Sequence, residues 1–233
     1  MAGIPSNEPS TAHEDNTCDA LETNIPKLDG CSEKRRSVHT ADQALERLKA
    51  GNLEFLRSHT NSSNISQETV RRLYDDGQHP FAVIIACSDS RVAPEHVFMA
   101  GLGDLFTIRT AGNAVGNLEA ASAYYAASHL HAPLIVVMGH TQCGAITSAQ
   151  TGNYEPIMAP LLNPIAKAIG PEKSPYAASE RNVRNTLDTL KSYAPIALLC
   201  ARNKLKVIGA MYRTSDGQVD FLPEKPRSME PEP

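Results

Sequence analysis

Apolar residues along this chain fall into two patterns, and each pattern predicts a different element. Short, continuous runs at residues 81–86 and 134–138 are rich in β-branched side chains and predict buried strands. In residues 40–57 the apolar positions recur at helical spacing, with Thr40 as the N-cap. Further strands are predicted at residues 105–110 and 205–212, and further helices at residues 118–130, 145–150, 160–169 and 178–193.

The repeated order of strand, turn and helix predicts an α/β fold. We expect a mostly parallel central β-sheet flanked by helices on both faces. Near the C-terminus, the pair Asp216-Gly217 separates residues 207–213 from residues 218–222, and Asp-Gly is a preferred turn of β-hairpins. We therefore expect an antiparallel edge strand at that end of the chain.

Composition divides the chain of 233 residues into one domain and two tails. Residues 1–37 are acidic and have little apolar periodicity, which predicts a disordered N-terminal tail. Residues 223–233 are rich in Pro and Glu and predict a flexible C-terminal tail. The residues between them, 38–222, are numerous enough to bury a core without disulfides, and we expect them to form a single domain.

Charge and cysteine content narrow the classes of partner and compartment. The formal net charge is −4 and there is no long basic block, so nothing favours nucleic acid or an anionic membrane surface as a partner. No segment has the apolar length of a membrane span. The expected partner is a small molecule. Five cysteines is an odd number, and two of them have metal-type spacing, which favours a reducing, cytoplasmic location over a disulfide framework.

Two short strings carry the candidate chemistry. Cys87 directly follows the first apolar run, and His140 ends the second, with Cys143 three residues later. Ligands in open α/β sheets bind at the carboxyl ends of strands, so adjacent strands would bring these side chains together. Each of them alone is more often an ordinary core residue. Together, two thiolates and one imidazole suit zinc, and three protein ligands with an open fourth place are typical of a catalytic zinc site.

Asp89 has two possible roles in such a site. It can coordinate the metal as a fourth ligand and close the site, or it can form a bidentate pair with the guanidinium of Arg91. Because two thiolates already neutralise the divalent charge, water on this zinc should be less acidic than in a three-histidine site. We therefore expect activity to rise into the alkaline range, and a flat profile from about pH 6 to 9 would contradict this reasoning.

The chain resembles the β-class carbonic anhydrases, from about Thr40 to Leu222. The matching stretches are Cys87-Ser-Asp-Ser-Arg-Val92 with Pro94-Glu95, Gly103-Asp-Leu-Phe106, Arg109-Thr-Ala-Gly-Asn113, Gly139-His-Thr-Gln-Cys-Gly-Ala145, Asn182-Val-Arg184 and Ile208-Gly209 with Tyr212. Together these motifs are highly specific to the family.

The resemblance implies reversible hydration of carbon dioxide to bicarbonate and a proton through a zinc-bound hydroxide, that is, a carbonate dehydratase and a zinc lyase. It implies one Zn²⁺ per subunit and a homodimer or a dimer of dimers, in which the helix of residues 40–57 reaches over the neighbouring subunit. Site residues carried over from the family are the zinc ligands Cys87, His140 and Cys143, the catalytic pair Asp89 and Arg91, and the pocket residues Val92, Ala111 and Gly112.

Departures from the family pattern leave two alternatives open. Many relatives carry Gln where this chain has Ala100, and Asn where it has Thr110, which makes the pocket more apolar. An apolar pocket would suit a carbonyl sulfide or carbon disulfide hydrolase on the same scaffold. The other alternative is a non-catalytic zinc-binding homologue with Asp89 held permanently on the metal, and the intact Arg91 argues against it. The chain has no Trp, so the tryptophan-dependent bicarbonate regulation of some members does not carry over.

Overall fold

The computed structural model describes residues 38–58, 60 and 63–223. The two predicted tails lie outside these residues, except for Pro223. The elements, in chain order, are α1 (Ala41–Arg57), α2 (Gln67–Asp76), β1 (Ala82–Cys87), α3 (Pro94–Val97), β2 (Leu105–Thr110), the 3₁₀ helix η1 (Ala111–Asn113), α4 (Asn117–His129), β3 (Leu134–His140), α5 (Gly144–Thr151), the 3₁₀ helix η2 (Pro156–Met158), α6 (Ala159–Ile169), α7 (Pro175–Ser192), α8 (Ala194–Ala201), β4 (Lys206–Tyr212) and β5 (Val219–Phe221).

The five strands form one sheet in the order β2-β1-β3-β4-β5. Strand β1 pairs in parallel with β2 and β3, and β3 pairs in parallel with β4. Strand β5 pairs antiparallel with the end of β4, with Tyr212 opposite Val219. The predicted fold class, a mostly parallel sheet with an antiparallel edge near the C-terminus, is thus confirmed.

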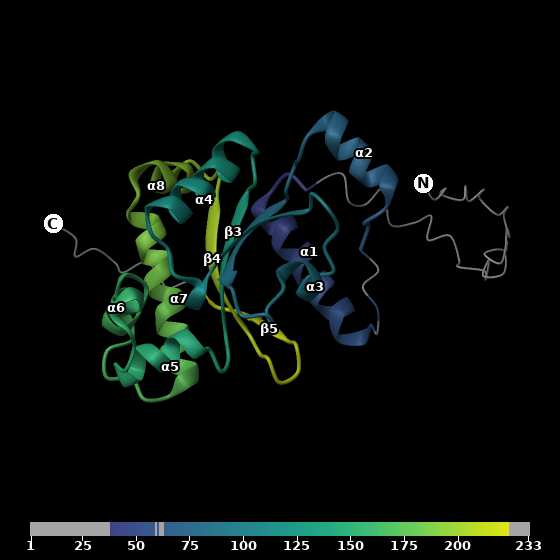
Figure 1. Cartoon of the computed structure of the whole chain (residues 1–233). Coiled ribbons are helices and arrows are strands. Elements are labelled where there is room, and N and C mark those ends of the chain that lie inside the picture. The colour runs from purple at the N-terminus through teal and green to yellow at the C-terminus, as the bar shows by residue number, and fades with distance from the viewer. Residues whose placement is uncertain (1–37, 59, 61–62, 224–233) are drawn as a thin grey trace, which may run out of the picture. The chain divides into compact units, whose positions relative to one another are not determined.

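Helices cover both faces of the sheet. In Figure 1, α1, α2 and α3 lie on one side of the strands, and α4, α7 and α8 lie on the other. Alternate residues of β1 belong to different cores, because successive side chains of a strand point to opposite faces. Ile84 packs in the cluster that includes Leu48 of α1, whereas Ile85 packs in the cluster that includes Val183 of α7. The central strands are therefore buried on both faces, as the continuous apolar runs predicted.

Helix α1 packs against the sheet of its own chain. Thr40 caps it as predicted: its hydroxyl accepts the Gln43 amide, and the Gln43 side chain accepts the Thr40 amide. Leu48 is completely buried against the sheet. The helix thus covers the core of its own chain, and its reach over a neighbouring subunit, which the resemblance implied, stays a prediction.

Asn52 attaches the C-terminal half of α1 to neighbouring segments by hydrogen bonds. Its amide nitrogen donates to the carbonyls of Val97 (3.2 Å) and Gly217 (2.9 Å), and its amide oxygen accepts the Val219 amide (2.9 Å). The side chain thereby ties α1 to the segment after β4 and to the start of β5. It is buried, so these bonds replace contacts that water would otherwise make.

Four α-helices differ from the prediction. Helices α2, α3 and α8 were not expected. Helix α8 is apolar almost throughout, so it lacks the alternation with polar residues on which a helical prediction depends. Helix α7 begins at Pro175, three residues before the predicted start. The missed signal is a start motif: the Ser174 hydroxyl accepts the Ala177 amide, and Pro175 fills the first helical position.

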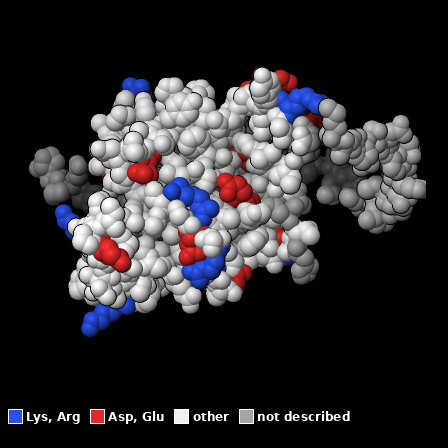
Figure 2. Space-filling view, in the orientation of Figure 1, with Lys and Arg blue, Asp and Glu red and all other residues white. Residues whose placement is uncertain are grey.

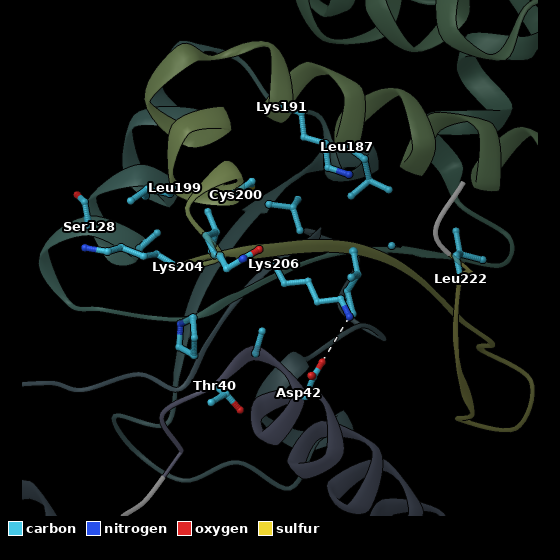
Figure 3. A pocket seen from close by; sticks show the side chains of 18 of the residues that line it. Thr40, Asp42, Ser128, Leu187, Lys191, Leu199, Cys200, Lys204, Lys206 and Leu222 are labelled. Carbon is cyan, nitrogen blue, oxygen red and sulfur yellow. Dashed lines mark hydrogen bonds and ion pairs between the residues drawn. The ribbon is translucent and has the colours of Figure 1, made fainter. Parts of the chain in front are cut away.

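A cavity of about 1060 Å³ opens between α1, β4, α7 and α8. Lys206 of β4 points across it toward Asp42 of α1, and the two form an ion pair at 3.4 Å (Figure 3). Pro133 and Val207 line this cavity near the amino ends of β3 and β4. The predicted metal ligands follow the carboxyl ends of strands, so the cavity is a separate feature of the molecule.

Acidic and basic side chains are mixed on the face of the molecule that Figure 2 shows. Figure 2 shows them next to one another near the centre of the face that is visible there, without a broad area of one sign. Among the residues that the structure describes, no helix combines the length and the apolarity needed to cross a bilayer.

Candidate metal centre

The parallel pairing of β1 with β3 brings the three predicted ligands together. Cys87 is the last residue of β1, His140 is the last residue of β3, and Cys143 caps α5. One potential ligand atom from each residue lies within 4.8 Å of those of the other two. All three side chains are buried. This spacing allows one cation to contact the three residues at once.

The imidazole of His140 is oriented so that it can coordinate a metal ion. Its Nδ1 lies 2.9 Å from the Thr141 carbonyl oxygen, so Nδ1 carries the hydrogen and donates it. That tautomer leaves an unshared electron pair on Nε2. Within the described part of the chain, Nε2 has no hydrogen-bond partner although it is buried. A buried acceptor without a partner is costly, and a metal ion between the ring and the two sulfurs would satisfy it.

The two cysteine sulfurs are electrostatically unequal. A hydrogen bond from the Cys143 thiol lowers the pKa of Cys87, and His140 and the amides of Asp89 and Gly112 lower it further against the effect of burial. The same hydrogen bond and burial raise the pKa of Cys143. The amides of Asp89 and Gly112 that point at the Cys87 sulfur favour a negative charge there, and a bound divalent cation would stabilise a second one on Cys143.

Asp89 forms the pair with Arg91 rather than approaching the cluster. The guanidinium donates from Nε to Oδ1 at 2.9 Å and from Nη2 to Oδ2 at 2.8 Å, and the Arg91 amide donates to Oδ1 at 2.9 Å. These hydrogen bonds hold the pKa of Asp89 well below its usual range, so it is ionised. Its Oδ2 lies 4.0 Å from Nε2 of His140. Of the two roles considered for Asp89, the structure thus has the one paired to Arg91.

The predicted pocket residues lie at different depths. The Gly112 amide donates to the sulfur of Cys87 at 3.2 Å, so this residue is directly beside the cluster. Ala111 precedes it and is partly exposed. Val92 is completely buried in the core cluster on the α1 side of the sheet. Their role toward a substrate remains a prediction.

Arg109 is a neighbour of the cluster that residue-by-residue reasoning missed. It lies on β2 opposite Ala86. Its guanidinium donates to the carbonyls of Cys87 (3.2 Å) and Asp89 (2.7 Å), and so it supports the backbone of the segment that carries both. Its position on a strand next to β1 was the available signal, because side chains of paired strands reach one another.

A buried Cys-His-Cys cluster at the carboxyl edge of a helix-covered, mostly parallel sheet defines an α/β protein with a candidate metal centre. The model of the carbonic anhydrase family matches residues 82–219, which include all three cluster residues. The chain belongs to this family, as a β-class carbonic anhydrase and hence a lyase.

Curated relatives and solved structures agree with this assignment. Carbonic anhydrase 2 of Mycobacterium tuberculosis is 31% identical over 189 residues, which cover 75% of this chain and 89% of that protein. The carbonic anhydrase of Mycolicibacterium smegmatis is 32% identical over 190 residues, covering 76% and 91%. The structure of the β-carbonic anhydrase CafA of Aspergillus fumigatus is similar with a TM-score of 0.62 and 26% identity, covering 69% of this chain and 85% of that one. For the β-carbonic anhydrase CcaA the TM-score is 0.57 and the identity 27%, with coverage of 78% and 93%.

Proposed function

We propose that the chain catalyses the reversible hydration of carbon dioxide to bicarbonate and a proton, with one Zn²⁺ per subunit bound by Cys87, His140 and Cys143. The observation that carries this proposal is the unpartnered, buried Nε2 of His140, which faces two cysteine sulfurs at ligand spacing. A soft sulfur pair with one imidazole suits zinc among the common divalent ions. When bound, zinc supplies an activated water as the nucleophile, which is the main chemical requirement of carbon dioxide hydration.

The residues around the cluster have separate roles in this proposal. Asp89, ionised and held by Arg91, accepts a hydrogen bond from the nucleophile and orients it. Arg91 keeps the carboxylate away from the metal. Val92, Ala111 and Gly112 form the wall beside which an uncharged, apolar substrate lies. The pairing of Asp89 with Arg91 supports a catalytic protein over a non-catalytic zinc-binding homologue, because the fourth position is then open.

Metal analysis tests the ligand assignment. We expect about one zinc per chain in the purified protein, and loss of most of it in Cys143→Ser. The matched control is Cys200→Ser, because Cys200 is also a free, partly buried cysteine but lies on α8, away from the cluster. Equal zinc content in both variants would contradict the assignment.

Stopped-flow assays test the reaction. We expect turnover of carbon dioxide that increases from about pH 6 to pH 9, for the reason given above for two thiolate ligands. Carbonyl sulfide and carbon disulfide are assayed in parallel, because Ala100 and Thr110 motivated a sulfur substrate. Turnover of these alone would replace the proposed reaction with the hydrolase alternative. A zinc-loaded protein that turns over none of the three would be the non-catalytic homologue.

We also propose a homodimer, alone or paired into a dimer of dimers. Strand β2 is at the edge of the sheet, with β1 as its one neighbour among the described strands. On the adjacent helix α4, Leu118 and Tyr125 are 80% and 47% exposed, and the Tyr125 ring lies 6.4 Å from that of Phe106 on β2. An open strand edge beside exposed apolar side chains is suited to a second copy of the chain. Leu118→Asp should reduce the mass measured by light scattering.

The proposed location is the cytoplasm. Zinc coordination by Cys87 and Cys143 requires both thiols to be reduced, and all the cysteines that the structure describes are free. Localisation of a tagged full-length chain in its native cell checks this; export to an oxidising compartment would contradict it.

A further inference from the structure

The short segment η1 lies beside the Cys-His-Cys cluster and has an unusual backbone conformation. Gly112 and Asn113 both have positive φ, +66° and +47°, a region that side chains other than glycine seldom adopt. A Cβ on Gly112 would approach Cδ1 of Ile165 to 2.8 Å. The space on that side of Gly112 is therefore too small for a side chain.

Helix α7 supports this segment with two buried polar side chains. The amide nitrogen of Asn182 donates to the Gly112 carbonyl at 2.7 Å. One turn later, the Thr186 hydroxyl donates to the Asn113 carbonyl at the longer distance of 3.4 Å. Both side chains are almost completely buried. The short bond from Asn182 is therefore the stronger of the two attachments between α7 and η1.

The residue that Asn182 holds is the one that contacts the candidate metal ligand. Gly112 offers its carbonyl to Asn182 and its amide to the sulfur of Cys87, at 3.2 Å. The two groups belong to the successive peptide planes that meet at the Gly112 Cα, so the bond to Asn182 holds one plane and limits the rotations that would turn the other away from the sulfur. A second amide, that of Asp89, approaches the same sulfur at 3.4 Å, so two backbone amides point at the sulfur of Cys87.

We infer that Asn182 is a positioning residue of the metal centre: by holding the Gly112 carbonyl, it aims the Gly112 amide at the sulfur of Cys87. This inference rests on the proposed zinc site. A hydrogen bond to a ligating sulfur withdraws electron density from it and fixes its direction, and partners of this kind influence metal affinity strongly. Asn182 itself touches neither metal nor substrate, and acts through one backbone residue.

The experiment compares Asn182→Leu and Asn182→Ala with Ser179→Ala. Ser179 is a matched control, because it is a buried polar residue on the same helix and its hydroxyl has no hydrogen-bond partner among the described residues. Zinc affinity is measured by competition with a chelator, and the Co²⁺-substituted proteins are compared by their sulfur-to-metal charge-transfer absorption. Circular dichroism establishes that each variant is folded.

We expect zinc binding about tenfold weaker in both Asn182 variants. The charge-transfer band should move to lower energy, because the Cys87 sulfur then keeps more of its electron density. Ser179→Ala should leave both quantities unchanged. Zinc affinity within about twofold of the unaltered protein, or an unmoved band, would overturn the inference. The same loss in Ser179→Ala would also overturn it, because the effect would then be one of helix packing.

Two other outcomes, variants that do not fold and an unaltered protein that binds no zinc, are distinguished as follows. If Asn182→Leu and Asn182→Ala do not fold, Asn182→Asp keeps the size of the side chain but replaces the donating amide by a carboxylate, and the band should move in the same direction. An unmoved band in that folded variant would overturn the inference. If the unaltered protein binds no zinc, the proposed function fails first. If it binds zinc and Asn182 has no effect, only the positioning role fails.

Discussion

Replacing Arg91 by Ala should convert Asp89 from a partner of the guanidinium into a competitor for the metal. In the structure, the two side chains share hydrogen bonds of 2.9 and 2.8 Å, and Oδ2 of Asp89 lies 4.0 Å from Nε2 of His140. A zinc ion sits about 2 Å from a ligating imidazole nitrogen and from a ligating carboxylate oxygen. A metal between them would therefore be within reach of Asp89 after a small movement, once Arg91 no longer restrains it.

The size of the expected fall in kcat follows from the two hydrogen bonds to Asp89 that Arg91→Ala removes. Bonds to charged groups contribute about 1.5–3 kcal/mol each when they are buried. The Arg91 side chain is 49% exposed, so solvent screens the pair and reduces both contributions strongly. We therefore expect loss of Arg91 to shift the equilibrium of Asp89 toward the metal by up to about 5-fold. That factor is the upper limit of the expected fall in kcat.

The fall in kcat of Arg91→Ala is measured by stopped-flow hydration of carbon dioxide at a fixed alkaline pH. Arg181→Ala is the matched control, because Arg181 has the same exposure, 50%, and loses an equally short ion pair, with Glu172 at 2.9 Å. It should retain full activity. In an Asp89→Ala background, removal of Arg91 should change kcat by less than about twofold, because no carboxylate is left to restrain. Full activity of Arg91→Ala, or an equal loss in both backgrounds, would refute the reasoning.

Three other changes test the framework around the site. Asn52→Ala leaves three backbone groups, two of them buried and one partly buried, without their partner and should lower the free energy of unfolding by about 2–4 kcal/mol, measured by urea denaturation. By contrast, replacement of the exposed Lys49 by Ala should change it by less than about 0.5 kcal/mol. Gly112→Ala places a methyl group 2.8 Å from Ile165 at φ +66° and should cost about 1–3 kcal/mol by the same method; no loss would show that η1 can relax. Arg91 lowers the pKa of Asp89, so the stabilisation from their pair is present above about pH 4 and is lost as the pH falls through the depressed value; Asp89→Asn should therefore destabilise the protein more at pH 7 than at pH 2, and an equal effect at both would contradict the pairing.

The parts of the fold that depend on local pattern could be predicted from the sequence. The runs at residues 81–86 and 134–138 are long enough and apolar enough to be strands buried on two faces, and β1 and β3 occupy nearly those residues. Because parallel strands end at the same edge of a sheet, the position of Cys87 and His140 directly at these ends predicted that they would meet. The turn at Asp216-Gly217 likewise predicted the antiparallel pairing of β4 with β5.

Contacts between distant segments could not be predicted in this way. Asn182 and its partner Gly112 are 70 residues apart, and Asn52 and Val219 are 167 apart. The hydrophobic pattern does not distinguish either asparagine from a solvated polar residue on a helix, and the family motif that contains Asn182 does not say which group it bonds. Such bonds depend on how whole helices dock on the sheet, and a single sequence carries no periodic signal of that docking. The choice of Asp89 between the metal and Arg91 depended on side-chain geometry for the same reason.

The order of the candidate ligands along the chain has a consequence for assembly. Cys87 and Cys143 enclose residues 88–142, and this span contains both β2 and α4, the elements with the open strand edge and the exposed Leu118. A cation bound to both sulfurs closes that span into a ring and reduces the entropy of its unfolded forms. If the proposed dimer forms through that edge, metal occupancy and self-association are linked equilibria, so each should strengthen the other. Removal of the ion with a chelator should then weaken the proposed dimer before it unfolds the sheet.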